Sequence, residues 1–432
     1  MKIKTIHIPE VGEEFKTFTH PSGMRVILAE KDLYTGYGLL SVDFGSILEE
    51  YEEEGGIFSF PDGTAHFLEH KMFENPDGAD TFVKFDACGA DANAYTSTDR
   101  TCYLFSTSDD FCKGLSVLLE SVFTPFFTPE NVKKEKGIIL QELKMYRDNP
   151  YEAVSRALIS AMYERLRIRN DICGSIRSVK SVTADDLTRA YTRFYRPERM
   201  ILTLCGRFNA DEVIRVIDAC VPAQGTVLPP CRAIGEKNEN TVFKRKKTLY
   251  CGVTTPMFAA GIKCPAYGLS GQERLIAYNY MSVAAQALFA TSSPFVSRLR
   301  AEGLLPFDCS DDVVCDRDCA HILFFAHTFD VKKTEKIFFE EIGRLITEGI
   351  GEECFERTKK LLYSSFLSEF NSSESTAHLY SSDAFDGIDT SLVPSSILNM
   401  TGEKAAEFIA KILRREAISV VAALPQQQKG AL

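Results

Sequence analysis

The pentapeptide at residues 66–70 restricts the possible folds of this chain more than any other feature. It runs His66-Phe67-Leu68-Glu69-His70. In a helix, residues four apart lie on one face, so both imidazoles can reach the same ion. Glu69 lies on that side too, within reach of a water on the ion. A catalytic zinc needs three protein ligands and an open position. The fold must therefore bring a third ligand from another segment.

Residues 128–143 offer that ligand. Thr128-Pro129-Glu130 has the capping hydroxyl, the early proline and the early acid that are typical of a helix start. Glu135 and Glu142 are seven residues apart, two helical turns, and therefore point the same way. We take Glu142 as the third zinc ligand and Glu135 as a supporting residue. The alternatives are a structural or surface histidine pair and glutamates on a solvated helix face.

Three ordered motifs resemble one family. They are residues 63–73 around the pentapeptide, the run Asn93-Ala94-Tyr95-Thr96, and the segment from Glu135 to Glu142 followed by Asp148-Asn149-Pro150. All three are similar to the pitrilysin, insulysin and mitochondrial-processing-peptidase family, whose H-x-x-E-H helix is that of the inverted zinc peptidases. The resemblance runs the length of the chain and is closest to short bacterial members that look like processing peptidases.

The flanks of the pentapeptide are similar to a narrower group. Pro61-Asp62-Gly63 before it and Lys71-Met72-Phe73-Glu74 after it resemble a Firmicute subtype. That subtype is named for an association with the aminopentanol modification of elongation factor P.

The family resemblance implies roles for individual residues in the N-terminal half. It implies Zn²⁺ bound by His66, His70 and Glu142. It makes Glu69 catalytic as the general base, with Glu135 as a second catalytic candidate that supports the site. It also implies that a strand edge faces the substrate backbone, with the substrate-binding residues Asn93, Ala94 and Tyr95.

In the C-terminal half the resemblance is incomplete. Arg300 matches an arginine with which family members hold the scissile region of the substrate. The tyrosine that usually accompanies it is missing, since Pro306 or Phe307 stands in its place. The family's assistance to the transition state from this half therefore does not carry over to this chain.

We predict an α+β protein of two homologous domains, each an antiparallel-rich sheet backed by helices. The length of 432 residues allows two or more domains. The predicted borders are 1–221 for the zinc-binding domain, 222–247 for a linker rich in proline and glycine, and 248–432 for the second domain. Alternating and β-branched residues predict strands at 24–29, 38–44, 93–105 and 200–206. Helices are predicted at 111–123 and 153–166.

The two halves show a weak repeat with an offset of about 222 residues. In this register Asn149 meets Asn371, Glu142 meets Ser364 and His70 meets Ser292. The second domain is therefore expected to lack metal ligands. The family forms clamshells from two such chains or halves, which implies that this chain is half a clamshell. A homodimer or a heterodimer with a homologous subunit is expected.

Composition excludes several classes of protein. A net charge of −11 argues against nucleic acid as a partner. No apolar run reaches the roughly 18 residues of a membrane span, and the N-terminus lacks the apolar stretch of a signal peptide. We expect a cytoplasmic protein with no membrane partner, in which the acidic run at 49–56 forms a solvated loop.

The thirteen cysteines include no C-x-x-C pair and are expected to be reduced. Cys309, Cys315 and Cys319 with His321 leave a second metal site open as an alternative.

The function predicted from these features is that of a zinc-dependent metalloendopeptidase. It would cleave peptides or unfolded protein segments through a zinc-activated water. The alternative is a non-catalytic or weakly catalytic member of the family. Such a protein would act as a scaffold or partner subunit in protein processing or modification.

Overall fold

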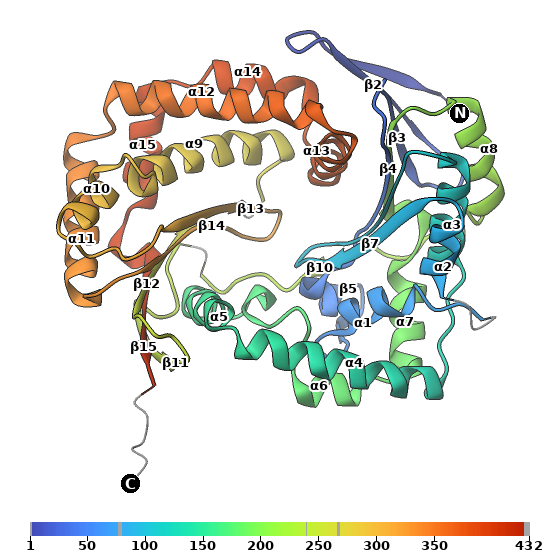
Figure 1. Ribbon diagram of the computed structural model, residues 1–432, viewed down its shortest axis with the longest axis horizontal. Helices are drawn as coiled ribbons and strands as arrows, with labels where there is room; N and C mark the ends of the chain where they lie inside the picture. Colours follow the sequence, from blue (N-terminus) through green and yellow to red (C-terminus); the bar gives the residue numbers. More distant parts are fainter. Residues whose placement is uncertain (1, 77–79, 239, 266–267, 427–432) are drawn as a thin grey trace. The chain divides into compact units, whose positions relative to one another are not determined.

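The computed structural model describes residues 2–76, 80–238, 240–265 and 268–426 (Figure 1). The chain forms two compact units, each assembled from three segments. Unit 1 comprises Met1–Leu143, Asn170–Ile234 and Phe366–Ser391, and unit 2 comprises Lys144–Arg169, Gly235–Ser365 and Leu392–Leu432. Each unit thus includes a segment from the other half of the sequence. The predicted borders at 221 and 248 follow the repeat in the sequence. They do not take into account that each unit contains a segment from the other half.

Unit 1 is built on a seven-stranded sheet in the order β1-β2-β3-β9-β4-β8-β7. Only β3 and β9 run parallel, and every other neighbouring pair is antiparallel. The strands are β1 Lys4–Ile8, β2 Glu13–Thr19, β3 Arg25–Glu30, β4 Gly36–Val42, β7 Ala90–Thr96, β8 Thr101–Thr107 and β9 Met200–Gly206. The central strands β4 and β9 are buried throughout, as expected for strands with both faces covered.

Unit 2 is built on a five-stranded sheet with the same arrangement. Its order is β11-β15-β12-β14-β13, and only β11 and β15 run parallel. The strands are β11 Lys246–Cys251, β12 Met257–Cys264, β13 Ser310–Cys315, β14 Ala320–His327 and β15 Ile418–Pro425. Strand for strand this matches β3-β9-β4-β8-β7 in order and direction. The predicted α+β fold with two related domains is confirmed.

Helices cover both sheets (Figure 1). Those that lie in unit 1 or begin there are α1 Thr64–Lys71, α2 Thr81–Asp86, α3 Phe111–Phe123, α4 Pro129–Asp148, α6 Ile176–Ser181, α7 Ala184–Phe194, α8 Ala210–Cys220 and α13 Ser373–Asp386. The others are α5 Pro150–Met162, α9 Gly271–Phe289, α10 Pro294–Ala301, α11 Val331–Glu348, α12 Glu352–Ser368, α14 Val393–Leu398 and α15 Gly402–Ile412.

The exchanged segments are helices at equivalent places in the two halves. In unit 1, α13 packs on β9, β4 and β3, although it comes from the C-terminal half. In unit 2, α5 packs on β15, β11 and β12, the strands that match those three. The helix pairs α4–α5 and α12–α13 lie about 222 residues apart, the offset of the sequence repeat. The repeat therefore includes the exchange.

Two local predictions about unit 1 are wrong. The single strand expected over 93–105 is a hairpin, β7 and β8, because Ser97 and Arg100 close a turn in which Ser97 Oγ donates to Asp99 Oδ1 at 2.7 Å. The acidic run expected as a solvated loop forms the hairpin β5 Glu50–Glu53 and β6 Gly56–Ser59, which pairs with β10 Arg232–Ala233. Glu49, at its start, is buried.

The ring of Phe105, on β8, is closely packed between β4 and α3. A single methyl group added beside it should therefore destabilise the protein. A Cβ added at Gly38 would lie 2.2 Å from Phe105 Cε1, while Gly114 closes the other side of the same buried ring. Gly38→Ala is expected to lower the free energy of unfolding by about 1–3 kcal/mol, because the ring cannot move away. Chemical denaturation measures it.

Gly137→Ala in α4 is the matched control, because its new methyl meets nothing within 4 Å. It should be neutral or stabilising, since alanine suits a helix interior better than glycine. Equal losses of stability in the two variants would contradict the packing argument.

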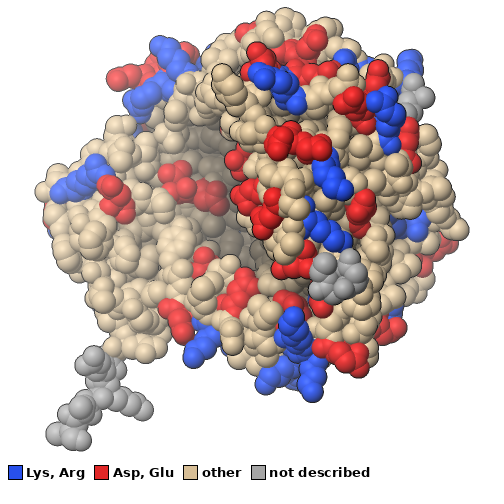
Figure 2. Space-filling model, turned by 45° about the vertical axis from the view of Figure 1, so that its right-hand side comes forward, with Lys and Arg blue, Asp and Glu red and all other residues tan. Residues whose placement is uncertain are grey.

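Two of the predictions from composition concern the charge of the surface and the state of the cysteines. The face in Figure 2 carries acidic side chains with scattered basic ones among its described residues, and no continuous basic area. All thirteen cysteines are free thiols. Among the described residues, no helix combines the length and the apolar character that crossing a bilayer requires.

Candidate metal centre

The pentapeptide lies on α1, a short helix whose N-terminus is held by a distant carboxylate. Glu49 accepts hydrogen bonds from the backbone N–H groups of Gly63 at 3.1 Å and Ala65 at 2.9 Å. A carboxylate at a helix N-terminus satisfies free N–H groups and is favoured by the helix dipole. Thr64 is the first helical residue, and its hydroxyl donates to Pro61 O.

The helix α4 carries the two glutamates. It begins as predicted, with Thr128 Oγ1 accepting from Asn131 N at 3.2 Å. Val132, Ile139 and Leu143 form its buried stripe. Because this stripe fixes the rotation of the helix, Glu135 and Glu142 are both turned toward α1.

The three predicted ligand side chains meet at one point. The donor atoms of His66, His70 and Glu142 all lie within 4.8 Å of one another, the one such group among the described residues. Glu142 Oε2 is 3.6 Å from His66 Nε2 and 3.4 Å from His70 Nε2. Two ligands about 2.0–2.1 Å from a tetrahedral zinc would be about 3.3–3.4 Å apart. The arrangement therefore fits a zinc ion without a large movement.

One oxygen of the group has no hydrogen-bond partner among the described residues. Glu142 Oε2 is buried and makes no hydrogen bond with a described residue. A buried carboxylate oxygen without a partner is costly, and a cation bound there would supply one. The stretch with Cys309, Cys315 and Cys319, where a metal site was left open, forms no such group in the described chain.

Glu135 contacts the centre through one of the ligands. Its Oε1 lies 2.9 Å from His70 Nδ1, so Nδ1–H donates to it and Nε2 is turned toward Glu142. Burial disfavours the charged imidazolium, but the hydrogen bond to Glu135 and the neighbouring carboxylate of Glu142 outweigh it and raise the pKa of His70 to about 9. The neighbouring imidazoles of His66 and His70 hold the pKa of Glu142 far below its usual range. A carboxylate behind a ligating histidine fixes its tautomer and orientation.

Glu69 is held from the sheet. Thr96 Oγ1, at the end of β7, donates to Glu69 Oε2 at 2.6 Å. The predicted base thus lies beside the histidines on α1, and its carboxylate is bonded to the strand predicted to bind substrate. Sequence reasoning gave Thr96 no role. The signal that could have found it is strand alternation, which puts Thr96 on the same face as Ala94.

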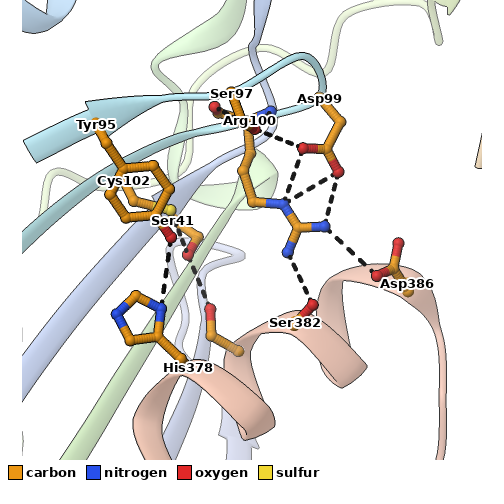
Figure 3. Close-up of polar contacts among 10 residues, drawn as sticks. Ser41, Tyr95, Ser97, Asp99, Arg100, Cys102, His378, Ser382 and Asp386 are labelled. Carbon is orange, nitrogen blue, oxygen red and sulfur yellow. Dashed lines mark hydrogen bonds and ion pairs between the residues drawn. The ribbon is translucent and has the colours of Figure 1, made fainter. Parts of the chain in front are cut away.

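The strand β7 is the edge of its sheet, and no described strand pairs with its outer side. The predicted substrate residues divide between its two faces: Ala94 shares the face of Thr96, and Asn93 shares that of Tyr95. Figure 3 shows Tyr95 pointing to α13, where its hydroxyl lies 3.4 Å from His378 Nδ1. Nearby, Arg100 contacts Asp99 and, on α13, Asp386. The free edge can take an added extended strand.

The predicted arginine belongs to unit 2. Arg300 lies near the end of α10, and its guanidinium contacts Asp308 Oδ1 at 2.9 Å. Phe307, at the place of the missing tyrosine, is largely exposed and stands edge-on to His327. The substrate-binding role of Arg300 stays a prediction.

The contact between Glu135 and His70 makes a prediction for metal affinity. Glu135→Gln is expected to weaken zinc binding about 10–100-fold, because an amide is a poorer acceptor for the Nδ1–H of a ligating histidine. Competition with a coloured chelator measures the effect. Glu130→Gln, on the exposed first turn of the same helix, should leave the affinity unchanged. If Glu135→Gln bound zinc as tightly as the parent, Glu135 would have no role in the site.

Family models match most of the chain. Residues 35–175 match the model described as insulinase (peptidase family M16), and residues 181–362 match that of the peptidase M16 inactive domain. The first match contains all three candidate ligands. The second contains the strands β9, β10, β11, β12, β13 and β14 and none of those ligands.

Individual relatives agree with these matches. An uncharacterized zinc protease of Bacillus subtilis, YmfH, is 31% identical over 98% of this chain and 100% of its own length. The β subunit of human mitochondrial-processing peptidase is 29% identical, over 50% of this chain and 45% of its own. The crystal structure of an M16-like peptidase from Alicyclobacillus acidocaldarius superposes with a TM-score of 0.90 at 29% identity, covering 98% of this chain and all of that one.

Proposed function

Because the chain belongs to the M16 (insulinase) family of peptidases, we propose that it is a zinc-dependent metalloendopeptidase. The observation that carries the proposal is the meeting of His66, His70 and Glu142 at zinc-binding distances, with the buried Glu142 Oε2 left without another partner. Glu69, the candidate general base, lies on the same helix as the two histidines. The site therefore has residues for both a metal and a base.

Each residue of the site would have a separate chemical role. His66 and His70 would bind the metal through Nε2, and Glu142 through its carboxylate. When bound, zinc supplies a water of lowered pKa and polarises the scissile carbonyl. Glu69 would accept the proton of the attacking water and later pass it to the leaving amine. Glu135 would orient His70 by accepting its Nδ1–H.

The free edge of β7 supports an extended substrate. A peptide added there would bond to the strand backbone between Ala90 and Thr96, so recognition would depend on extended shape more than on side chains. Ala94 and Thr96, on the face with Glu69, would lie closest to the scissile bond. The proposed substrates are therefore peptides or unfolded protein segments, which can become extended.

Pairing with a second chain is part of the proposal. One relative is named as a subunit of a processing peptidase, and the family resemblance implies that two such chains enclose a chamber. We propose a homodimer or a heterodimer with a homologous subunit. Native mass spectrometry of the purified chain, alone and with a co-encoded homologue, tests this: a monomer in both samples would contradict it.

A library of quenched peptides tests the activity. The purified chain is expected to contain about one zinc per chain and to cleave part of the library, to lose cleavage on treatment with a chelator, and to regain it with zinc. Zinc content without cleavage of any peptide would favour the second candidate, a scaffold or weakly catalytic partner subunit. The observation behind that candidate is the missing tyrosine at Pro306 and Phe307.

A further inference from the structure

The carboxylate of Glu69 is bonded to the sheet through one hydroxyl group. Thr96 Oγ1 lies 2.6 Å from Glu69 Oε2. An ionised carboxylate only accepts hydrogen bonds, so the single hydroxyl proton of Thr96 is given to Glu69. A charge-assisted bond of this length is among the stronger side-chain hydrogen bonds.

The surroundings of Thr96 limit what its hydroxyl can do instead. Its cross-strand partner in the β7–β8 ladder is Thr101, whose Oγ1 lies 3.4 Å away. Thr101 is fully buried and donates its own proton to Phe44 O at 2.8 Å. The Thr101 proton is therefore engaged elsewhere, and the Thr96 hydroxyl is free to hold Glu69.

The bond joins two parts of the site that lie far apart in the sequence. Glu69 is on α1 with the histidines, whereas Thr96 ends the edge strand that also carries Ala94. A β-branched residue in a strand has few favoured χ1 rotamers, and the one that Thr96 adopts directs its hydroxyl at Glu69. The orientation of the base and the position of an added strand thus depend on the same few residues.

We infer that Thr96 is a positioning residue of the peptidase, which holds the carboxylate of Glu69 in its working orientation from the substrate-binding strand. The inference rests on the proposed function for its effect on turnover. It rests on the structure alone for its effect on the Glu69 side chain.

The test compares two substitutions that differ in one group. Thr96→Val keeps the β-branched shape and removes the hydroxyl, and Thr96→Ser keeps the hydroxyl. In the zinc-loaded protein, Thr96→Val is expected to lower kcat for a cleaved peptide about 10–100-fold, the usual cost of losing an outer partner. KM and zinc content should stay near parental values, and Thr96→Ser should keep kcat within about threefold of the parent.

Thr107→Val is the matched control. Thr107 lies at the other end of the same ladder, six residues or about 20 Å from Thr101, and its hydroxyl donates to Gly89 O. The same chemical change there should leave kcat unaltered. A parental kcat in Thr96→Val, or an equal fall in Thr96→Ser, would overturn the inference.

Crystal structures of the zinc-loaded parent and of both Thr96 variants give a readout that needs no activity. Glu69 should keep one carboxylate orientation in the parent and in Thr96→Ser, and lose it in Thr96→Val. If the parent cleaves no peptide, the proposed function fails, and these structures still decide the role of Thr96. An unchanged Glu69 in Thr96→Val would then refute it.

Discussion

Glu69→Gln is expected to lower kcat for peptide cleavage about 10²–10⁴-fold, the range that removal of a general acid–base group usually costs. The amide cannot take a proton from the attacking water. It matches the carboxylate in shape, and its oxygen can still accept the hydrogen bond from Thr96. None of the three candidate ligands is changed. Initial rates with a cleaved quenched peptide, measured beside zinc content, give the result.

The zinc content distinguishes a lost base from a lost site. If the glutamine variant binds zinc as the parent does and turns over slowly, Glu69 moves the proton. Cleavage at the parental rate would mean that the base is another group. Loss of zinc together with loss of turnover would instead mean that Glu69 helps to hold α1 in place, and the assignment would need revision.

The helix α1 and its pair of histidines could be predicted from the sequence because the information is local. Two histidines four residues apart share a helix face wherever the helix lies, and two glutamates seven apart do the same on α4. The capping signal at Thr128 and the buried stripe of α4 are also local patterns. What remained was whether the two helices meet, and the structure brings Glu142 to within 3.4 Å of His70.

The features that sequence reasoning missed depend on partners far along the chain. Glu49 caps α1 from fourteen residues away, and because this partner is distant, the acidic run at 49–56 looked like a solvated loop. The helix α13 packs on a sheet whose strands precede it by more than 160 residues, and no local periodicity encodes such a contact. The turn at Ser97–Arg100 was missed for another reason, because strand-forming residues on both sides hid a short polar cluster.

Glu142→Ala is expected to weaken zinc binding by far more than the roughly 10–100-fold that loss of an outer partner costs. The substitution removes one of the three proposed protein ligands and the only negative charge among them. It leaves two imidazoles, which cannot by themselves complete a site of the catalytic kind. Peptide cleavage should be lost together with the metal. Zinc content after dialysis, and affinity by chelator competition, measure the effect.

Zinc affinities of variants at three glutamates along α4 test this prediction more sharply than Glu142→Ala alone. Glu142, Glu135 and Glu130 lie on one helix, and their relations to the histidines differ. Glu142 is the proposed ligand, Glu135 is the partner of His70 Nδ1, and Glu130 is an exposed side chain of the first turn. The loss of affinity should therefore fall from Glu142 to Glu135 and vanish at Glu130. A larger loss at Glu135 than at Glu142 would exchange their roles, because the two carboxylates share a helix face. Such a result would make Glu135 the ligand and would require the histidine rings to turn from their present orientation.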